Sequence, residues 1–248
     1  ARLAADAAAH GKRIQLEMGG KNPLVVLDDA DLDRAVAVAL DGSFFSTGQR
    51  CTASSRLIVS DGIHDRFVAA LAQRAAALNV GHALDPATQI GPVASEEQRD
   101  TIEAYLRIAA DEGAQIVVGG ERVRRPTDGY FLAPALIAGS TPEMTINRQE
   151  VFGPVASVIR VSGLEEAIAI ANASEFGLSA GIVTTSLANA SAFKRRIQAG
   201  MVMINAPTAG VDYHVPFGGT KASSMGPREQ GFAAAEFYTR MKTIYTCA

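Results

Sequence analysis

The sequence predicts an α/β protein with a layered, mostly parallel sheet and helices on both faces. Short apolar segments bounded by turn residues alternate with longer helical segments between residues 24 and 205. Connections of that length join parallel strands, because antiparallel neighbours need only a tight turn. Of the 248 residues, 48% are hydrophobic and 20% are charged, which is typical of a globular domain with a sizeable core.

The individual elements follow from local composition. Residues 1–10 are good helix formers, and Gly11 is suited to end that helix. The acidic turn at 28–31 favours a helix start, because carboxylates stabilise a helix amino terminus. Ser95-Glu96-Glu97-Gln98 has the spacing of a capping box and predicts a helix to about Glu112. The other expected helices cover 32–45, 64–78, 164–173 and 187–197, and the expected strands cover 13–17, 24–27, 56–60, 114–118, 155–161, 179–184 and 201–205.

The C-terminal region has a different pattern. Residues 206–228 are rich in loop-forming types, 229–237 predict a short helix, and 243–246 predict an isolated strand. The structural alternative for that last strand is to join the sheet of its own chain.

Charge and composition exclude several classes of protein. The net charge of -3 gives no basic surface of the kind that binds nucleic acid. No apolar run reaches the length that spans a membrane, and no cleaved leader is expected. Two cysteines, Cys51 and Cys247, do not make a disulfide framework, and the four histidines are scattered, so no metal site is expected.

Two side chains can carry reactive chemistry, Cys51 and Glu17. A thiolate is a strong nucleophile and a carboxylate can activate water, so together they can form an acyl-enzyme and hydrolyse it. The thiolate is the reactive form, so Cys51 needs a lowered pKa or a nearby base. The alternatives are an inert core thiol for Cys51 and a surface carboxylate for Glu17. A Cys–His hydrolase would need one of the histidines beside the thiol.

Four blocks closely resemble the aldehyde dehydrogenase superfamily, in family order and over nearly the whole chain. Leu-Glu-Met-Gly-Gly-Lys-Asn-Pro at 16–23 resembles the segment with the general-base Glu. Ser-Thr-Gly-Gln-Arg-Cys-Thr at 46–52 resembles the segment with the nucleophilic Cys. Gln-Glu-Val-Phe-Gly-Pro at 149–154 resembles the segment that binds the nicotinamide ribose. Pro-Phe-Gly-Gly-Thr-Lys at 216–221, followed by Gly-Pro-Arg-Glu-Gln-Gly at 226–231, resembles the C-terminal motif.

The resemblance implies roles for particular residues. Cys51 would be the nucleophile and Glu17 the base that activates the deacylating water. The implied contacts to the cofactor, NAD or NADP, are Glu150, Phe152 and Gly19. The implied substrate contacts are Arg50, Thr52 and Phe217.

Several of these residues have a structural alternative. Glu150 could merely begin a turn, and Arg50 could form an outward salt bridge. Asn22 and Asn205 are expected to order loops rather than to bind an oxyanion, for which the Cys51 backbone N–H is the expected donor. The adjacent phenylalanines at 44–45 are expected in the core more than in a substrate tunnel.

The implied reaction is the oxidation of an aldehyde to a carboxylic acid. A thiohemiacetal on Cys51 would lose hydride to the nicotinamide, and water would hydrolyse the resulting thioester. Residues 206–230 resemble the branch that oxidises 2-oxoglutarate semialdehyde, so the expected substrate is a semialdehyde that bears a carboxylate. One alternative is a coenzyme A-acylating enzyme, which can dispense with Glu17. The other is a non-catalytic structural or oligomerisation module.

The resemblance also implies a domain division. Family members are considerably longer, so the chain resembles their C-terminal half and is expected to be inactive alone. Residues 1–19 would be a remnant of the cofactor-binding domain, 20–228 the catalytic domain, and 229–248 a tail with an oligomerisation strand. A cytoplasmic homo-oligomer, either a dimer or a tetramer, is expected.

Overall fold

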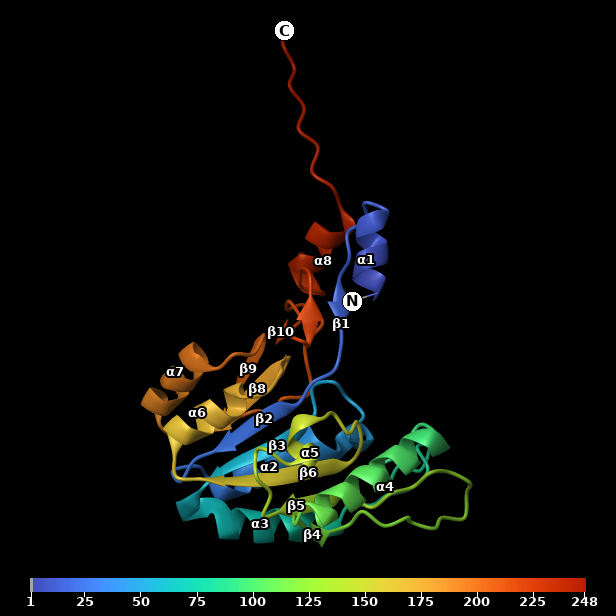
Figure 1. Ribbon diagram of the computed structural model, residues 1–248, viewed down its shortest axis with the longest axis vertical. Coiled ribbons are helices and arrows are strands. Elements are labelled where there is room, and N and C mark those ends of the chain that lie inside the picture. The colour runs from blue at the N-terminus through green and yellow to red at the C-terminus, as the bar shows by residue number, and fades with distance from the viewer. Residues whose placement is uncertain (1) are drawn as a thin grey trace.

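A seven-stranded sheet forms the main body of the computed structural model, which describes residues 2–248 (Figure 1). Ala1, which begins the expected opening helix, lies outside the described residues. The strand order is β4-β5-β6-β3-β2-β8-β9, with β4–β5 antiparallel and the other neighbouring pairs parallel. The mostly parallel sheet predicted from the sequence is thus confirmed. The strands are β2 (Asn22–Val26), β3 (Ser54–Ser60), β4 (Gln115–Val118), β5 (Ala135–Ala138), β6 (Val155–Val161), β8 (Ser179–Val183) and β9 (Met201–Ile204).

Helices cover both faces of this sheet, as predicted (Figure 1). Side chains alternate along each strand, so Leu24 of β2 belongs to the core on one face and Val25 to the core on the other. Burial on both faces explains why these strands are almost continuously apolar. The covering helices are α2 (Leu32–Phe44) and α3 (Asp61–Ala76) on one face, and α6 (Leu164–Asn172) and α7 (Leu187–Arg196) on the other.

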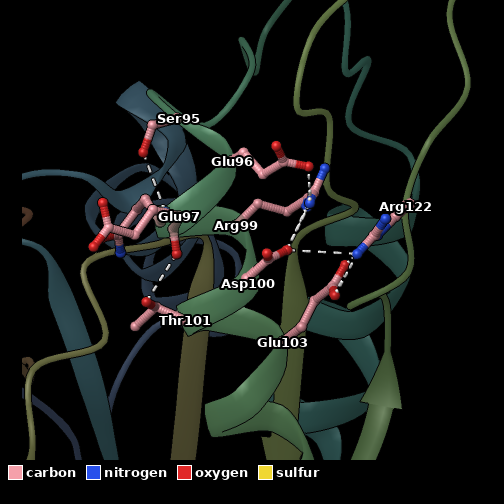
Figure 2. Close-up of polar contacts among 9 residues, drawn as sticks. Ser95, Glu96, Glu97, Arg99, Asp100, Thr101, Glu103 and Arg122 are labelled. Atoms are coloured by element: carbon pink, nitrogen blue, oxygen red, sulfur yellow. Dashed lines mark hydrogen bonds and ion pairs between the residues drawn. The ribbon is translucent and has the colours of Figure 1, made fainter.

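A third core lies beside β5, where α4 (Glu96–Asp111) and α5 (Thr145–Arg148) pack. The amino terminus of α4 is capped as predicted, since Ser95 Oγ accepts a hydrogen bond of 3.2 Å from the Gln98 N–H (Figure 2). A network of ion pairs also covers this end of α4. Most of its carboxylates are exposed, so water screens the pairs. The members are Glu96, Arg99, Asp100, Glu103 and Arg122.

The reciprocal hydrogen bond of the predicted capping box, from the Gln98 side chain to the Ser95 backbone, does not form. The Gln98 side chain does not return to Ser95. Its Nε2 donates instead to the carbonyl oxygens of Val151 and Phe152, at 2.9 and 3.0 Å. Gln98 therefore ties α4 to the loop that precedes β6.

A smaller arm rises from the main body and contains α1 (Arg2–Ala9) and α8 (Gly231–Tyr238) (Figure 1). In this arm β1 (Leu16–Glu17) pairs antiparallel with β11 (Ser224–Met225). A second short pair, β7 (Phe176–Gly177) with β10 (Thr220–Lys221), lies where the arm meets the body. The first nineteen residues thus contact the C-terminal region.

The sequence prediction fails at several short elements. It missed β5 and α5, which have four residues each and show too little periodicity to detect. The strand expected at 13–17 shrinks to two residues, and the helix expected at 229–237 begins at Gly231. Among the described residues, 243–246 form no strand, so the alternative that they join the chain's own sheet is wrong. No helix within residues 2–248 is long and apolar enough to cross a membrane.

Candidate active site

The expected catalytic and cofactor residues meet at one edge of the main sheet. Glu17 and Gly19 precede β2, Cys51 precedes β3 and Glu150 precedes β6, and these strands are neighbours in the order β6-β3-β2. Because the strands are parallel, their amino ends lie at the same edge and bring the three lead-in segments together. Open α/β sheets commonly bind ligands at the opposite, carboxyl edge. The location alone would therefore not have suggested this site.

The backbone before Cys51 is unusual. The 3₁₀ turn η1 (Phe45–Gly48) contains Ser46, Thr47 and Gly48 with φ angles of 54°, 60° and 62°. Left-handed φ angles cost energy for Ser and Thr, and they persist where the surrounding structure requires them. A Cβ at Gly48 would overlap the carbonyl oxygen of Gly153. The loop that carries Cys51 and the loop that carries Glu150 are therefore in backbone contact.

Asn22 fixes the Cys51 loop to the sheet. Its Nδ2 donates to the carbonyl oxygens of Cys51 and Ala53, at 2.8 and 2.9 Å. Its Oδ1 accepts a hydrogen bond of 3.0 Å from the Ser179 N–H. Asn205 forms two similar hydrogen bonds of 3.0 Å with the backbone beyond β8. The loop-ordering role predicted for both asparagines is confirmed.

The two glycines after Met18 allow close contact between the three segments. A Cβ at Gly19 would overlap Oε2 of Glu150, and a Cβ at Gly20 would overlap the carbonyl oxygen of Cys51. Each glycine therefore packs against one of the other two segments. A larger residue at either position would push the segments apart.

The Cys51 thiol is half-buried beside two carboxylates. Burial raises the pKa of the thiol, and the negative charges of Glu150 and Glu17 raise this pKa further. Hydrogen bonding by the backbone N–H groups of Cys51 and Thr52 acts in the opposite direction. The expected lowering of the pKa is therefore not found, and the thiol has nearby bases instead.

Arg50 bonds to helix α2. Its Nη2 donates to the carbonyl oxygen of Asp41 at 2.9 Å and lies 3.8 Å from the Asp41 carboxylate. This ion pair is the structural salt bridge that was the alternative for Arg50, with the Arg50 side chain 25% exposed and the Asp41 side chain 54% exposed. Arg50 Nε is buried and has no hydrogen-bond partner among residues 2–248. The same side chain lines a pocket between the Cys51 and Glu150 loops, together with Gly20, Gly48 and Phe152.

The other two expected substrate contacts lie apart from each other. Thr52 is 5% exposed, and its carbonyl oxygen accepts a hydrogen bond of 2.7 Å from Thr208 Oγ1. Phe217 lies in the arm, where two backbone hydrogen bonds of 2.8 Å join it to Glu229. The residue after Phe217 packs against the Glu17 carboxylate. Phe217 is therefore the chain neighbour of a residue that contacts Glu17, and Thr52 is a core residue next to Cys51.

The arm also holds Glu17. In the β1–β11 pair, Glu17 lies opposite Ser224, whose hydroxyl donates to Glu17 Oε2 at 2.7 Å. Gln15 Nε2 donates to the other oxygen, Oε1, at 3.3 Å. These two hydrogen bonds give the half-buried carboxylate a defined orientation.

Glu150 is the second carboxylate that raises the pKa of the Cys51 thiol. Its Oε1 accepts a hydrogen bond of 2.9 Å from the Gly20 N–H. Burial raises the pKa of Glu150, while the Gly20 N–H and the Lys21 charge act against that rise. Phe152, two residues further on, has a left-handed φ of 55° and is 40% exposed. The structure therefore brings Gly19 and Glu150 into contact and leaves the Phe152 ring partly open to solvent.

Two buried cations near this edge were not identified from the sequence. Lys21 is 2% exposed, and burial, helped by the charge of Arg56, lowers its pKa to about 7. Arg56 is 3% exposed and donates through Nε to the Lys21 carbonyl oxygen at 2.9 Å. Its two terminal nitrogens donate to carbonyl oxygens at the end of α6, at 3.1 and 3.0 Å. The available signal was a single Arg in the otherwise uncharged strand at 54–60.

No histidine within residues 2–248 hydrogen-bonds to Cys51. His10 bonds to Asp6, His64 to Asp65, and the His82 ring accepts from the Leu84 N–H. The alternative of a Cys–His hydrolase therefore lacks its second residue.

The comparison with known proteins gives the class. A model of the aldehyde dehydrogenase family matches residues 1–244. The chain belongs to the aldehyde dehydrogenase family.

Two curated relatives are similar along almost the whole chain. Alpha-ketoglutaric semialdehyde dehydrogenase of Bacillus subtilis (strain 168) is 46% identical over 241 residues, which cover 96% of this chain and 49% of that protein. Betaine aldehyde dehydrogenase of Rhizobium leguminosarum bv. trifolii (strain WSM2304) is 45% identical over 245 residues, which cover 98% of this chain and 50% of that protein. The chain therefore spans about half the length of the curated relatives it matches.

Solved structures share the fold. Betaine aldehyde dehydrogenase from Staphylococcus aureus in complex with NAD+ superposes with a TM-score of 0.92 at 38% identity, over 96% of this chain and 47% of that chain. An NAD-dependent aldehyde dehydrogenase from Sinorhizobium meliloti gives the same four values. The predicted fold class and the family resemblance are both confirmed.

Proposed function

We propose that this chain provides the catalytic part of an NAD(P)-dependent aldehyde dehydrogenase of the acid-forming kind. The observation that carries the proposal is that the segments with Cys51, Glu17 and Glu150 meet at one edge of the sheet. Close contacts at Gly19 and Gly20 join these segments, and both carboxylates raise the pKa of the Cys51 thiol. A nucleophile next to a base can form an acyl-enzyme and then hydrolyse it. A purely structural module would have no need for this arrangement.

Cys51 is the proposed nucleophile. Its sulfur adds to the aldehyde carbon and gives a thiohemiacetal, while its own backbone N–H donates to the developing oxyanion. Because burial and two carboxylates raise the pKa of the thiol, a base must accept its proton as the sulfur attacks. The carboxylates of Glu17 and Glu150 are close enough to act on the thiol electrostatically, so they are the candidates.

Glu150, Gly19 and Phe152 are the proposed cofactor contacts. Bound NAD+ supplies the acceptor for the hydride that leaves the thiohemiacetal. The residues fit this role because Glu150 uses Oε1 to bind the Gly20 N–H, while its Oε2 lies against Gly19, which has no side chain to cover it. Such an oxygen suits a ribose hydroxyl donor. The complex of the S. aureus relative with NAD+ favours NAD over NADP.

Glu17 is the proposed base for the second half of the reaction. Loss of hydride leaves a thioester on Cys51, and a water must then attack its carbonyl carbon. The Glu17 carboxylate accepts a proton from that water, and the acid product leaves as the sulfur takes up the freed electron pair. This step separates the proposal from a coenzyme A-acylating enzyme, in which the acyl group passes to a thiol.

The proposed substrate is a semialdehyde that bears a carboxylate. The similarity to the B. subtilis alpha-ketoglutaric semialdehyde dehydrogenase supports this choice. Relatives called betaine aldehyde dehydrogenases are almost as similar, and they favour a cationic aldehyde as the second candidate. Arg50 supports the anionic substrate, since its buried Nε has no partner among the described residues and a guanidinium can bind a carboxylate.

The tail is proposed to join a partner subunit. Met241, Ile244 and Tyr245 are 96%, 75% and 91% exposed, and such side chains favour burial in an interface. The proposed assembly is therefore a homo-oligomer. The proposed domain boundaries lie after residues 19 and 228. A reducing compartment such as the cytoplasm is proposed because it would keep the catalytic thiol reduced. Removal of residues 240–248 should reduce the oligomer mass measured by light scattering.

Rapid-mixing kinetics test the reaction in the enzyme that carries this chain. Cys51→Ala should form no NADH from any aldehyde. Glu17→Gln should give a burst of NADH followed by slow turnover, because hydride transfer precedes the step that needs activated water. Appreciable NADH from the Cys51 variant, or a Glu17 variant with no burst and normal turnover, would reject the assignment.

Substrate choice is tested by kcat/KM. The wild type should prefer a semialdehyde with a distal carboxylate over an aliphatic aldehyde of equal length and over betaine aldehyde. Arg50→Ala should reduce the preference. Preference for betaine aldehyde would replace the first candidate with the second, and a preference kept in the variant would remove Arg50 from the substrate site.

A further inference from the structure

Ser224 is a residue that the family comparison did not assign and that contacts Glu17 directly. It lies on β11, opposite Glu17 in the antiparallel pair. Its Oγ donates to Glu17 Oε2 at 2.7 Å and accepts a hydrogen bond of 2.6 Å from the Gly219 N–H. Ser224 is half-buried, so neither contact is simply a bond at an open surface.

We propose that Ser224 is the positioning residue that orients the Glu17 carboxylate for attack by water on the thioester. The inference rests on the proposed role of Glu17 as the deacylation base. The direction of the hydroxyl follows from its partners. A backbone N–H can only donate, so the Gly219 N–H occupies a lone pair of Oγ and the hydroxyl proton points to Glu17.

The anchor behind Ser224 is rigid. A Cβ added to Gly219 would lie 2.9 Å from the carbonyl oxygen of Gly177 and from Leu178 Cα, so the backbone there is closely packed. The Met18 N–H donates to the carbonyl oxygen of Ser223 at 2.9 Å, which extends the pairing beyond Glu17. Both the backbone and one carboxylate oxygen of Glu17 are therefore held by the same short strand.

The other carboxylate oxygen stays available for water. Oε1 has one long hydrogen bond of 3.3 Å, from Gln15, and lies 3.0 Å from where a Gly218 Cβ would stand. The same Cβ would lie 2.9 Å from Arg228 Nη1, which donates to the Gly219 carbonyl oxygen, so a positive charge lies near the carboxylate. The Cys51 thiol is close enough for the Glu17 charge to raise its pKa. With Oε2 held by Ser224, Oε1 is the oxygen that can receive a proton from water.

The Ser224 hydrogen bond restricts the rotation of the Glu17 carboxylate. Less orientational freedom then has to be lost in the deacylation step. Without the hydroxyl, the carboxylate should be less well aligned with the attacking water.

Ser224→Ala tests the proposal in the enzyme that carries this chain. Deacylation should slow about tenfold, as expected for loss of a hydrogen bond to a charged group. The burst of NADH should be retained, because hydride transfer precedes the step that needs Glu17. Ser224→Thr, which keeps a hydroxyl, should restore the rate of deacylation.

A control and a double variant separate this role from a structural one. Ser179→Ala removes a buried hydroxyl that has no hydrogen-bond partner in residues 2–248, so it should leave the burst and the rate of deacylation unchanged. Adding Ser224→Ala to Glu17→Gln should cause no further slowing if Ser224 acts through Glu17. Additive losses, or normal deacylation in the single Ser224→Ala variant, would overturn the inference and leave the proposed role of Glu17 intact. Normal deacylation in Glu17→Gln alone would instead reject the proposed function.

Discussion

Replacing Asn22 with alanine tests how the Cys51 loop is held in place. The side chain is 2% exposed and forms three hydrogen bonds with backbone groups of two other segments. Its removal would leave the carbonyl oxygens of Cys51 and Ala53 and the Ser179 N–H without these bonds. A buried polar group that loses its partner costs about 1–3 kcal/mol, and water can enter part of the space. The free energy of unfolding should therefore fall by about 3–5 kcal/mol.

The variant should also change the reactivity of the thiol. The exposed Cys247 would react first, so the measurement is made with Cys247→Ser in both proteins. Loss of the Asn22 contacts should free the Cys51 loop and speed its alkylation by iodoacetamide, since the wild-type thiol is half-buried. Asn205→Ala, which removes two comparable bonds beyond β8, should reduce stability in urea without speeding alkylation. Equal alkylation rates in the Asn22 variant and the wild type would refute this reasoning.

Three other substitutions, one of them with a matched control, have defined outcomes. Glu150→Gln should move the pH profile of Cys51 alkylation to lower pH, because a charge that raises the pKa of the thiol is removed; an unchanged profile would contradict this. Gly20→Ala should lower kcat on the order of 100-fold, because its Cβ would overlap the Cys51 carbonyl oxygen. Gly163→Ala, whose Cβ meets no described atom within 4 Å, should leave kcat unchanged. Lys21→Met should raise the urea midpoint most at pH 6, because wild-type folding must then bury a charge. The pKa of Lys21 is about 7 in the folded protein and about 10.4 in the unfolded chain, so the wild type gains stability as the pH rises between these values. The difference in urea midpoint between the variant and the wild type should therefore shrink as the pH rises across that range. A difference in midpoint that does not depend on pH would contradict this.

The fold could be predicted where local patterns are strong. β2, β3, β6 and β8 are apolar runs between turn residues, and the helices that connect them are long enough to detect. Strand order was not predictable, because it depends on contacts between segments far apart in the chain. The antiparallel β4–β5 pair was missed for the same reason, and β5 itself is a four-residue strand directly after Pro134.

The candidate site was predicted in part. The motifs identified Cys51, Glu17 and Glu150, but the order β6-β3-β2 that brings them together is visible only in the structure. Ser224 carries no sequence signal, since its role depends on the pairing of β1 with β11. The raised pKa of the Cys51 thiol could not be predicted either, because it depends on burial and on two carboxylates from other segments.

The covalent intermediate is the most direct test of the proposed mechanism. Glu17→Gln enzyme is mixed with NAD+ and the semialdehyde, quenched in acid during the slow phase, digested and examined by mass spectrometry. The account predicts that the peptide containing Cys51 gains the mass of the acyl group, and that Cys51→Ala in the same background gains none. An acyl group on Cys247, or no acyl group on either cysteine while NADH is formed, would contradict the assignment of Cys51 as the nucleophile.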